Sequence, residues 1–552
     1  MLLTMTIALG AATPMAALTD EYLRELWKAS PMTASQAGYH QDGVDGKLDD
    51  LSADARKRRA EWLRQFAARL DAVKADGDDA ADRALMHDAV ALERLELDEA
   101  HDFAKRCDAP LDALGGAFFQ LATRPYAPEA KRLADVVARL RALPRYLEQA
   151  RAGLTTSVDA FREAAKDDGD GLIDYLEHDL ADVFHHSADL KAPTETAIKA
   201  IRDYLSFVDK ELPKKPHADF RYGAALYEKR FKPYLQTSRT PAEVLAAAKA
   251  RVKALHEQMR ALAKKIDPKG DIRSALNIIA NDHPKPEALF ESVRNELDDA
   301  RRFVQDKKLL TLPSHDNLRV IETPPFLRSQ LGVAAFDGAP PLQPELGAFY
   351  YVTPFPKDWP AQKIEAKLRE YNRYMLMLIT IHEAMPGHYV QFESASKLEP
   401  INKRVLRWLL GSNAYVEGWA VYAQQMMIDA GFWNHDPKLA LSNAKLELRS
   451  VTNAILDIEL QTGNLTDEDA LKLMMDDAFQ ERPEAELKLR RAKLSVTQLC
   501  SYYVGLQSWE EAHHIAMSKP GFSERAFNDY ALGKGAITMP TLIEWLKNQS
   551  FK

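Results

Sequence analysis

Apolar residues recur every three or four positions over long stretches of the chain, which is the spacing of amphipathic helices. In one such stretch Leu63, Phe66, Leu70 and Val73 share a single helical face. Glycine is scarce, with 24 residues among 552, so few positions interrupt the pattern. The pattern predicts a mainly α-helical protein.

A boundary between two helical lobes is expected near residue 240. A proline-rich and aromatic stretch ends there, and a helix start signal follows. Thr240 has the type of an N-cap, Pro241 suits the first helical position, and Glu243 completes a capping box. We therefore expect an N-terminal helical lobe over residues 18–239 and a second helical lobe over residues 240–552.

Residues 317–358 depart from the helical pattern and are rich in proline and β-forming side chains. Residues 318–322 and 348–353 have the composition of short strands, which would pair across the intervening loop. An irregular connector fits the same composition, so both alternatives stay open. A small sheet here would offer a free edge for an extended peptide just ahead of the segment described next.

The segment 374–392 begins as an apolar helix and then places His382, Glu383 and His388 in one short stretch. A zinc-binding helix usually carries two histidines four residues apart on one face, with a glutamate directly after the first. Here the histidines are six residues apart. An unbroken helix would rotate the second histidine about 240° from the first.

Pro386 and Gly387 offer a physical explanation for this spacing. Proline has no N–H to donate to the carbonyl of His382, and glycine adopts backbone angles that are closed to other residues. Together they would widen the turn into a bulge and return His388 to the face of His382. We therefore expect both histidines to bind one metal ion, and a kinked structural helix is the alternative.

A third metal ligand is expected on a neighbouring element, and Glu417 is the best candidate. It is the only acidic residue of the apolar, aromatic-rich segment 412–427. A carboxylate buried there needs a metal ion or another cation, and a salt bridge to arginine is the alternative. Two imidazoles and one carboxylate suit zinc and leave a fourth position for water.

Other histidines fit a metal site less well. His256 precedes a glutamate but has no second histidine within a turn or two. The adjacent His513 and His514 are interpreted as structural, although one of them could face the site. A further group lies opposite the apolar stripe of its segment, which favours a solvated face: His178, Asp182, His185 and His186.

With zinc in place, these residues predict hydrolysis of a carbonyl compound. Zinc lowers the pKa of a bound water, and Glu383 can take its proton and pass it to the leaving amine. Tyr502 or Tyr503 would donate a hydrogen bond to the oxyanion, with a buried structural tyrosine as the alternative. Arg449 or Arg491 would hold a substrate carboxylate.

Composition and charge exclude several other classes of protein. Hydrophobic residues make up 46% and charged residues 28% of the chain, as in ordinary globular proteins. The net charge is -8 with both signs interleaved, so neither nucleic-acid binding nor a polybasic membrane patch is expected. No apolar run reaches the roughly 18 residues needed to span a bilayer. Cys107 and Cys500 are expected to be free thiols.

Residues 1–17 are apolar and small, like the hydrophobic part and cleavage site of a secretory signal peptide, although the basic start is missing. We therefore expect a periplasmic or secreted protein, or a cytoplasmic one if this stretch is not a signal peptide. No cysteine lies near this end, so a lipid anchor is not expected.

These motifs resemble those of the DUF885 family of bacterial proteins over nearly the whole chain. The most specific part is His-Glu-x-x-Pro-Gly-His at 382–388, followed by Glu-Gly-Trp-Ala at 417–420. Three further segments contribute: LRELWKASPMTASQAGYH (23–40), LGAFYYVTPF (346–355) and QLCSYYVG (498–505).

The resemblance implies a two-lobed helical fold, zincin-like and similar to metallopeptidases, with a small β element beside the active-site cleft. It also implies His382, His388 and Glu417 as the metal ligands and Glu383 as the base. Tyr502 falls where the family usually has a tyrosine, which favours it over its neighbour. The lobe over residues 240–552 would then be the catalytic one.

Two positions depart from the family pattern. Members often carry a histidine in the segment that is 451–463 here, and this chain has none. If that histidine assists catalysis, the activity is expected to be altered or weaker. Tyr389 also stands where a histidine is frequent, and we expect this change to matter less.

Taken together, the sequence predicts a zinc-dependent hydrolase, most consistent with a metallopeptidase that acts on a peptide or a small amide. One alternative is a zinc hydrolase of a non-peptide amide or ester. The other is a non-catalytic helical binding protein with a structural metal.

Overall fold

The computed structural model describes residues 13–268, 271–314, 317–323, 328, 334–356 and 359–551. Helices dominate these residues and one small sheet accompanies them, which confirms the predicted mainly α fold with a small β element. The helices of the first half are α1 (Pro14–Ala29), α2 (Pro31–Gln36), α3 (Ala53–Ala72), α4 (Gly77–Leu95), α5 (Ala109–Thr123), α6 (Glu129–Gly153), α7 (Asp159–Asp174), α8 (Leu180–Val183), α9 (Ala188–Lys210) and α10 (Gly223–Leu235).

The second half continues with helices of similar length. They are α11 (Pro241–Ile266), α12 (Ile272–Ala280), α13 (Leu289–Lys307), α14 (Ala361–Glu370), α15 (Arg373–Glu383), α16 (His388–Ala395), α17 (Ile401–Leu410), α18 (Asn413–Asp429), α19 (Pro437–Gln461), α20 (Asp467–Lys472), α21 (Arg482–Leu494), α22 (Ser501–Met517), α23 (Glu524–Leu532) and α24 (Met539–Asn548). At the start of α11, Thr240 and Glu243 form the expected capping box, with backbone-to-side-chain bonds of 2.7 and 3.3 Å.

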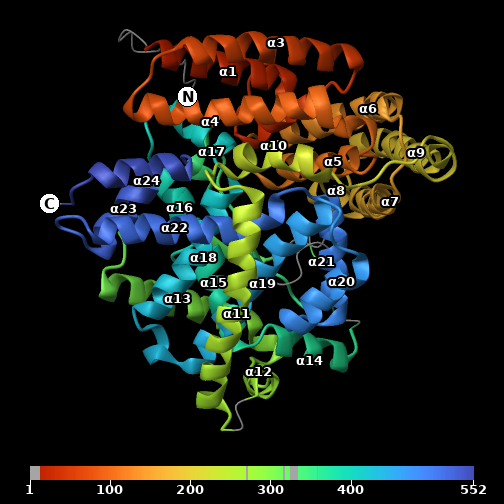
Figure 1. Ribbon diagram of the computed structural model, residues 1–552. Coiled ribbons are helices and arrows are strands. Elements are labelled where there is room, and N and C mark those ends of the chain that lie inside the picture. The colour runs from red at the N-terminus through yellow and green to blue at the C-terminus, as the bar shows by residue number, and fades with distance from the viewer. Residues whose placement is uncertain are drawn as a thin grey trace.

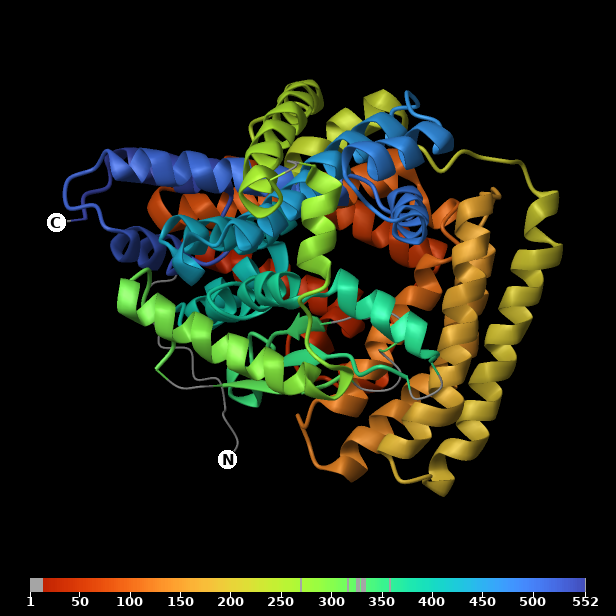
Figure 2. The same cartoon turned by 90° about the horizontal axis from the view of Figure 1, so that it is seen from below.

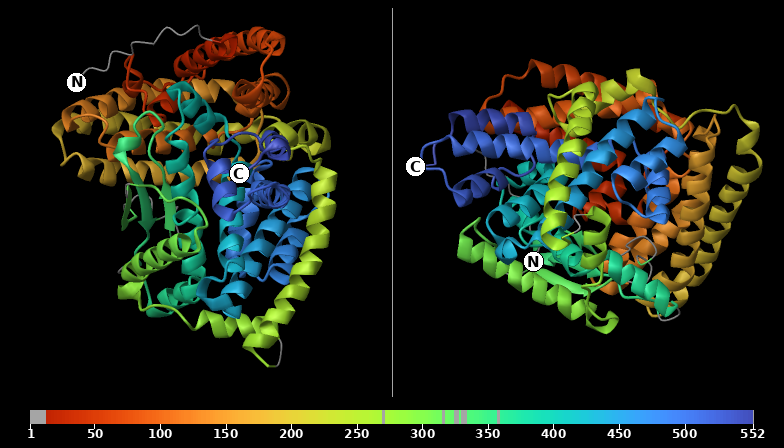
Figure 3. Two further views of the ribbon diagram at one scale, coloured as in Figure 1. Left: turned by 90° about the vertical axis from the view of Figure 1, so that its left-hand side faces the viewer. Right: turned by 60° about the horizontal axis from the view of Figure 1, so that its bottom comes forward.

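The N-terminal helices form a layer over one end of the second half (Figures 1 and 3). Helices α1, α3 and α4 lie at the outer end, and α6 and α9 pack side by side at one edge of the molecule (Figure 2). Below this layer, α18 and α22 pack closely together, and so do α11 and α19. The pair formed by α18 and α22 carries much of the site described below.

Separate hydrophobic cores hold these groups of helices. Helices α5, α6, α7 and α9 enclose one core, and α1, α3 and α4 enclose another, which Val405 and Leu406 of α17 join. The largest core lies in the second half and includes Tyr227 and Phe231 of α10. The division into lobes at residue 240 stays a prediction.

Residues 1–12 of the expected signal peptide lie outside the described residues. The end of that stretch belongs to α1, where Met15 is buried. No helix in the described part of the chain is long and apolar enough to cross a membrane.

The sheet contains both predicted strands and one more. Its strands are β1 (Leu318–Glu322), β2 (Ala334–Asp337) and β3 (Ala348–Val352), in the order β1-β3-β2. The predicted strands β1 and β3 pair directly and in parallel, and β2, which the sequence analysis missed, pairs antiparallel to β3. The central strand β3 is buried along its whole length. Strand β2 lies at one edge of the sheet and against α15.

Arg124, directly after α5, joins the N-terminal layer to this sheet. Its guanidinium donates to the carbonyl of Gly347 at 2.7 Å and to that of Gly338 at 2.8 Å, and it pairs with Asp337 at 2.7 Å. Since Asp337 ends β2, the layer holds the edge strand in place beside α15.

Candidate metal centre

The turn between α15 and α16 brings the two motif histidines together. The N–H of Met385 donates to the carbonyl of Thr380 at 3.0 Å, and the N–H of Gly387 donates to that of Ile381 at 2.9 Å. These bonds span five and six residues instead of the four of an α-helix. The expected bulge within one helix is therefore a break between two helices, because Pro386 has no N–H to continue the ladder.

Gly387 is required here because of close backbone contacts. A Cβ atom at this position would lie 1.8 Å from the carbonyl oxygen of His382 and 2.4 Å from that of Ile381. Trp419 of α18 closes the turn from the other side. Its indole Nε1 donates to the carbonyls of Pro386 at 3.0 Å and Gly387 at 3.2 Å, and its ring is fully buried. The sequence analysis had not identified this partner.

His382, His388 and Glu417 converge on one point. Nε2 of His382 lies 3.3 Å and Nε2 of His388 lies 3.6 Å from the same carboxylate oxygen of Glu417. In a tetrahedral zinc site with bonds of about 2.1 Å, neighbouring ligand atoms are about 3.4 Å apart. The donor atoms and their spacing therefore fit a zinc ion. In the described ranges, no other group of three histidine, cysteine or acidic side chains lies close enough to hold a metal.

The three side chains also form a coupled electrostatic unit. Burial raises the pKa of Glu417, but hydrogen bonds and charge from His382 and His388 outweigh burial and hold the pKa well below its usual range. Burial lowers the pKa of His388, and Glu417 more than offsets it, so the net shift is upward. Glu417 is thus an ionised carboxylate that is enclosed by protein, as a metal ligand must be.

Gln391, one turn after His388, is placed to orient that histidine. Its amide lies beside the imidazole and is buried. Among the residues with described side chains, neither Nδ1 of His388 nor the amide atoms of Gln391 has a hydrogen-bond partner. Metal-binding histidines usually donate their second ring N–H to such a group. A small rotation of the amide would supply that acceptor.

Glu383 faces the sheet edge. Its carboxylate accepts a hydrogen bond of 3.1 Å from the backbone N–H of Phe336 in β2. Burial raises the pKa of Tyr350 in β3, and the negative charge of Glu383 adds to that rise. Glu383 therefore lies between the histidines and the small sheet, with an orientation set by β2.

Tyr502 lies beside the metal centre and Tyr503 does not. The negative charge of Glu417, followed by burial, raises the pKa of Tyr502 to about 12. The hydroxyl of Tyr503 instead accepts a 3.0 Å hydrogen bond from Gln507, and its charged neighbours include Arg251. Of the two tyrosines, only Tyr502 is placed to reach a group bound at the centre.

Two glycines and one aspartate fix the position of Tyr502 relative to Glu417. A Cβ on Gly418 of α18 would lie 2.5 Å from the Cα of Gly505 in α22, so the two helix backbones touch. Asp457 of α19 accepts hydrogen bonds from the N–H groups of Thr497 at 3.0 Å and Leu499 at 2.9 Å. These bonds anchor the turn from which α22 begins.

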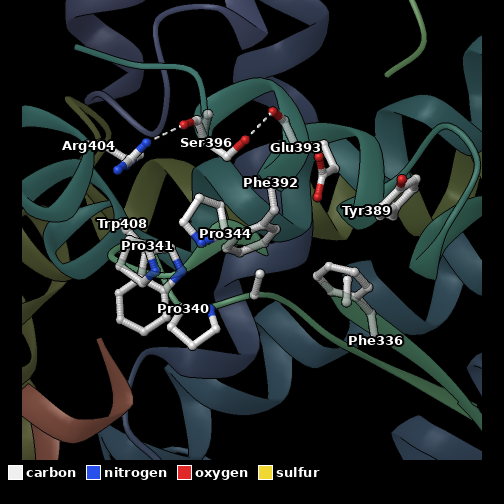
Figure 4. Close-up of a pocket in the computed structure, with 13 residues that line it drawn as sticks. Phe336, Pro340, Pro341, Pro344, Tyr389, Phe392, Glu393, Ser396, Arg404 and Trp408 are labelled. Carbon is white, nitrogen blue, oxygen red and sulfur yellow. Dashed lines mark hydrogen bonds between the residues drawn. The ribbon is translucent and has the colours of Figure 1, made fainter. Parts of the chain in front are cut away.

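A cavity of about 310 Å³ borders His388. Its apolar wall is formed by Phe336, Phe392, Trp408, Val416 and Pro340. The N-terminal layer contributes the amide side chains of Gln36 and Gln120. A neighbouring recess shares three of these aromatic rings and is lined further by Pro341, Pro344 and Tyr389 (Figure 4).

That recess has a volume of only about 30 Å³, which is room for about one water molecule. The 310 Å³ cavity is large enough for an amino-acid side chain, and one metal-site histidine forms part of its wall. It is therefore the space next to the centre that can receive part of a substrate.

The remaining candidates of the sequence analysis lie elsewhere. His513 makes a 2.9 Å hydrogen bond to Glu524, which confirms a structural histidine. Cys107 and Cys500 are buried free thiols. The group predicted to be solvated is exposed: His178, Asp182, His185 and His186.

Comparison with known proteins agrees with the motifs. The profile of a family described as "Bacterial protein of unknown function (DUF885)" matches residues 31–545. A solved structure from Shewanella oneidensis, described as "a putative lipoprotein of unknown function", has a TM-score of 0.82 and 27% identity, with 97% of this chain and 100% of that chain covered.

A second solved structure, described as a "putative lipoprotein" from Colwellia psychrerythraea, has a TM-score of 0.79 and 16% identity, with coverages of 97% and 99%. The second likeness concerns the fold alone. No curated protein matches the chain. Because the family profile covers nearly the whole sequence, the chain belongs to the DUF885 family.

Proposed function

We propose that the protein is a zinc-dependent hydrolase, and more specifically a metallopeptidase. The observation that carries this proposal is the convergence of His382, His388 and Glu417 with Glu383 directly beside the first ligand. A structural metal site does not need an acid at that position. A hydrolytic site does, because water must lose a proton as it attacks a carbonyl.

His382, His388 and Glu417 would hold the zinc ion through two Nε2 atoms and one carboxylate oxygen. When bound, zinc supplies Lewis acidity, which acidifies water and polarises the carbonyl under attack. Glu383 would accept the proton of the attacking water and deliver it to the leaving amine. Its bond to the N–H of Phe336 would hold the carboxylate in the right orientation.

Tyr502 would donate a hydrogen bond to the oxygen that becomes negative during attack. Burial and the charge of Glu417 keep its hydroxyl protonated at neutral pH, which a donor requires. A preorganised donor of this kind contributes about 3 kcal/mol to transition-state stabilisation.

The surroundings favour a peptide over a small ester. The edge strand β2 passes directly beside Glu383, and an extended peptide can add to such an edge through main-chain hydrogen bonds. The 310 Å³ cavity beside His388 would take a side chain next to the scissile bond. A hydrolase of a non-peptide amide or ester remains the alternative within the same chemistry.

The first test measures metal content and hydrolysis in matched variants. Wild type is expected to bind one zinc ion and to cleave members of a peptide library. His388→Ala should lose both properties, and Glu383→Gln should keep the metal and lose turnover. The controls are His256→Ala and Glu257→Gln, since this second His-Glu pair lies on α11 away from the centre.

Undiminished hydrolysis by Glu383→Gln would refute the mechanism. If wild type binds no zinc even after zinc is supplied, the turn between α15 and α16 has only a structural role. That result would favour a helical binding protein.

We also propose that the protein is exported across the inner membrane. The similar structure from Shewanella oneidensis is described as a "putative lipoprotein", and residues 1–17 have the composition of a signal peptide. Fractionation of cells that express the full chain tests this, with recovery in the cytoplasm alone as the contradicting result.

A further inference from the structure

A group of four basic side chains lies where α19 and α21 pack together. Helix α19 contributes Lys445 and Arg449, and α21 contributes Lys488 and Arg491. Residues three or four apart share one face of a helix, so each helix presents both of its cations on one side. We refer to these four residues as the basic cluster.

The basic cluster has more positive charge than its surroundings balance. Glu484 forms an ion pair with Arg449 and is the acid that acts on Lys488. Glu370 and Glu481 add negative charge near Lys445, and Glu370 is itself paired with Lys367 at 3.5 Å. In the described part of the structure, the ammonium groups of Lys445 and Lys488 make neither an ion pair nor a hydrogen bond. Four cations therefore lie near three acids, and neither lysine forms a direct ion pair with any of these acids.

Both lysines are partly buried. Protein atoms surround each ammonium group on most sides, yet both residues keep partial access to solvent. Burial, together with the charges of Arg449 and Arg491, lowers the pKa of Lys488 to about 7. A bound anion would reverse this shift, because an opposite charge stabilises the protonated amine.

Arg491 connects the basic cluster to Tyr502. Its guanidinium lies beside the hydroxyl of Tyr502. Arg491 also donates a 2.9 Å hydrogen bond to Gln498, in the turn before α22. Figure 1 shows α21 beside α19. One member of the cluster therefore neighbours Tyr502, which lies beside the metal centre.

We propose that the basic cluster binds a carboxylate of the substrate, so that the enzyme cleaves peptides that carry a free carboxylate close to the scissile bond. This proposal rests on the proposed peptidase function and adds its substrate class. Lysine and arginine together give the charge-assisted hydrogen bonds that a carboxylate accepts. The carboxylate belongs either to the C-terminus of the peptide or to an acidic side chain.

Three peptides that differ only at their C-terminal end test the proposal. They are an acetylated peptide with a free C-terminal carboxylate, its C-terminal amide, and the same amide with glutamate as the last residue. The ratio of kcat/KM for acid over amide is expected to exceed ten in wild type, since a charge-assisted hydrogen bond contributes about tenfold or more. A high ratio for the free acid alone identifies the C-terminus, and a high ratio for the glutamate peptide identifies a side chain.

Lys488→Met should bring the acid-to-amide ratio close to one. Lys493→Met is the matched control, because it removes a lysine from the same helix whose partner is Asp467 at 2.5 Å. The control should keep the wild-type ratio. Arg491→Gln provides a second variant at an exposed position, where folding is not at risk, and should lower the ratio as well. A wild-type ratio near one for both carboxylate peptides would overturn the proposal.

Binding without turnover separates this proposal from the proposed function. Calorimetry with the acetylated peptide acid and its amide is carried out on Glu383→Gln, with and without Lys488→Met. If wild type hydrolyses none of the three peptides but Glu383→Gln binds the acid in a way that depends on Lys488, the anion site is supported and the peptidase is contradicted. If wild type hydrolyses the peptides but Glu383→Gln binds the acid and the amide equally well, the peptidase proposal is supported and the anion site is contradicted.

Discussion

Trp419→Phe tests whether the broken turn between the two histidines owes its shape to the neighbouring helix α18. The indole N–H of Trp419 is the donor to two carbonyls of that turn, at 3.0 and 3.2 Å. Phenylalanine keeps an aromatic ring in the buried site but has no donor, so both carbonyls lose this partner.

The expected cost follows from burial and hydrogen bonding. Loss of a donor to a buried carbonyl costs about 1–3 kcal/mol. The smaller ring leaves a cavity that costs about 1 kcal/mol more. The metal-free variant should therefore be about 2–4 kcal/mol less stable than wild type. Zinc affinity should fall about 10–100-fold, the usual effect of removing support behind a metal ligand.

Trp509→Phe is the control for packing. This ring is also fully buried, lies 5.1 Å from Trp419, and donates its N–H to the carbonyl of Tyr415 at 3.0 Å. It does not contact the turn, so the variant should lose similar stability and keep wild-type zinc affinity. Thermal unfolding of the metal-free proteins measures the first quantity, and competition with a chromophoric zinc chelator measures the second. Equal zinc affinities in the two variants would refute the reasoning.

Two further predictions concern groups around the centre. Gln391→Leu should lower zinc affinity about 10–100-fold, because it removes the amide that can rotate to accept the second ring N–H of His388, and chelator competition at unchanged thermal stability would show this. Burial raises the pKa of Glu296 to about 8 from 4.5, so the folded state binds a proton that the unfolded chain has released. The stability from this proton is complete below pH 4.5 and is lost as the pH rises through 8. The melting temperature of wild type relative to Glu296→Gln should therefore fall between pH 5 and pH 8.5, and a constant difference would contradict the assignment.

Local patterns were sufficient to predict much of this molecule. The helical periodicity, the capping box at Thr240, and the strands at residues 318–322 and 348–352 depend on neighbours within a few positions. The nearness of the motif histidines was also expected, since Pro386 and Gly387 act on the backbone where they stand. The ligand set itself stays a prediction until a metal is measured.

Other features depend on contacts between distant segments, and local patterns do not contain them. In the sequence, Trp419 is one more apolar residue of its segment. Its hydrogen bond to the turn depends on the packing of α18 against that turn. The short strand β2 has little strand character of its own and forms because β3 provides its hydrogen bonds. Lys488 looks like an ordinary solvated lysine, and only the packing of α21 on α19 places it beside Arg449.

The backbone contact between Gly418 and Gly505 has a mechanical consequence. The two helices pack together along their length, and at these glycines their backbones are in direct contact. Glu417 is adjacent to this contact and Tyr502 is less than one turn from it. A methyl group at either glycine would force the two backbones apart and so increase the distance between Glu417 and Tyr502. The spacing of these two side chains is thus set by two hydrogen atoms, in a place where any other residue would act as a spacer.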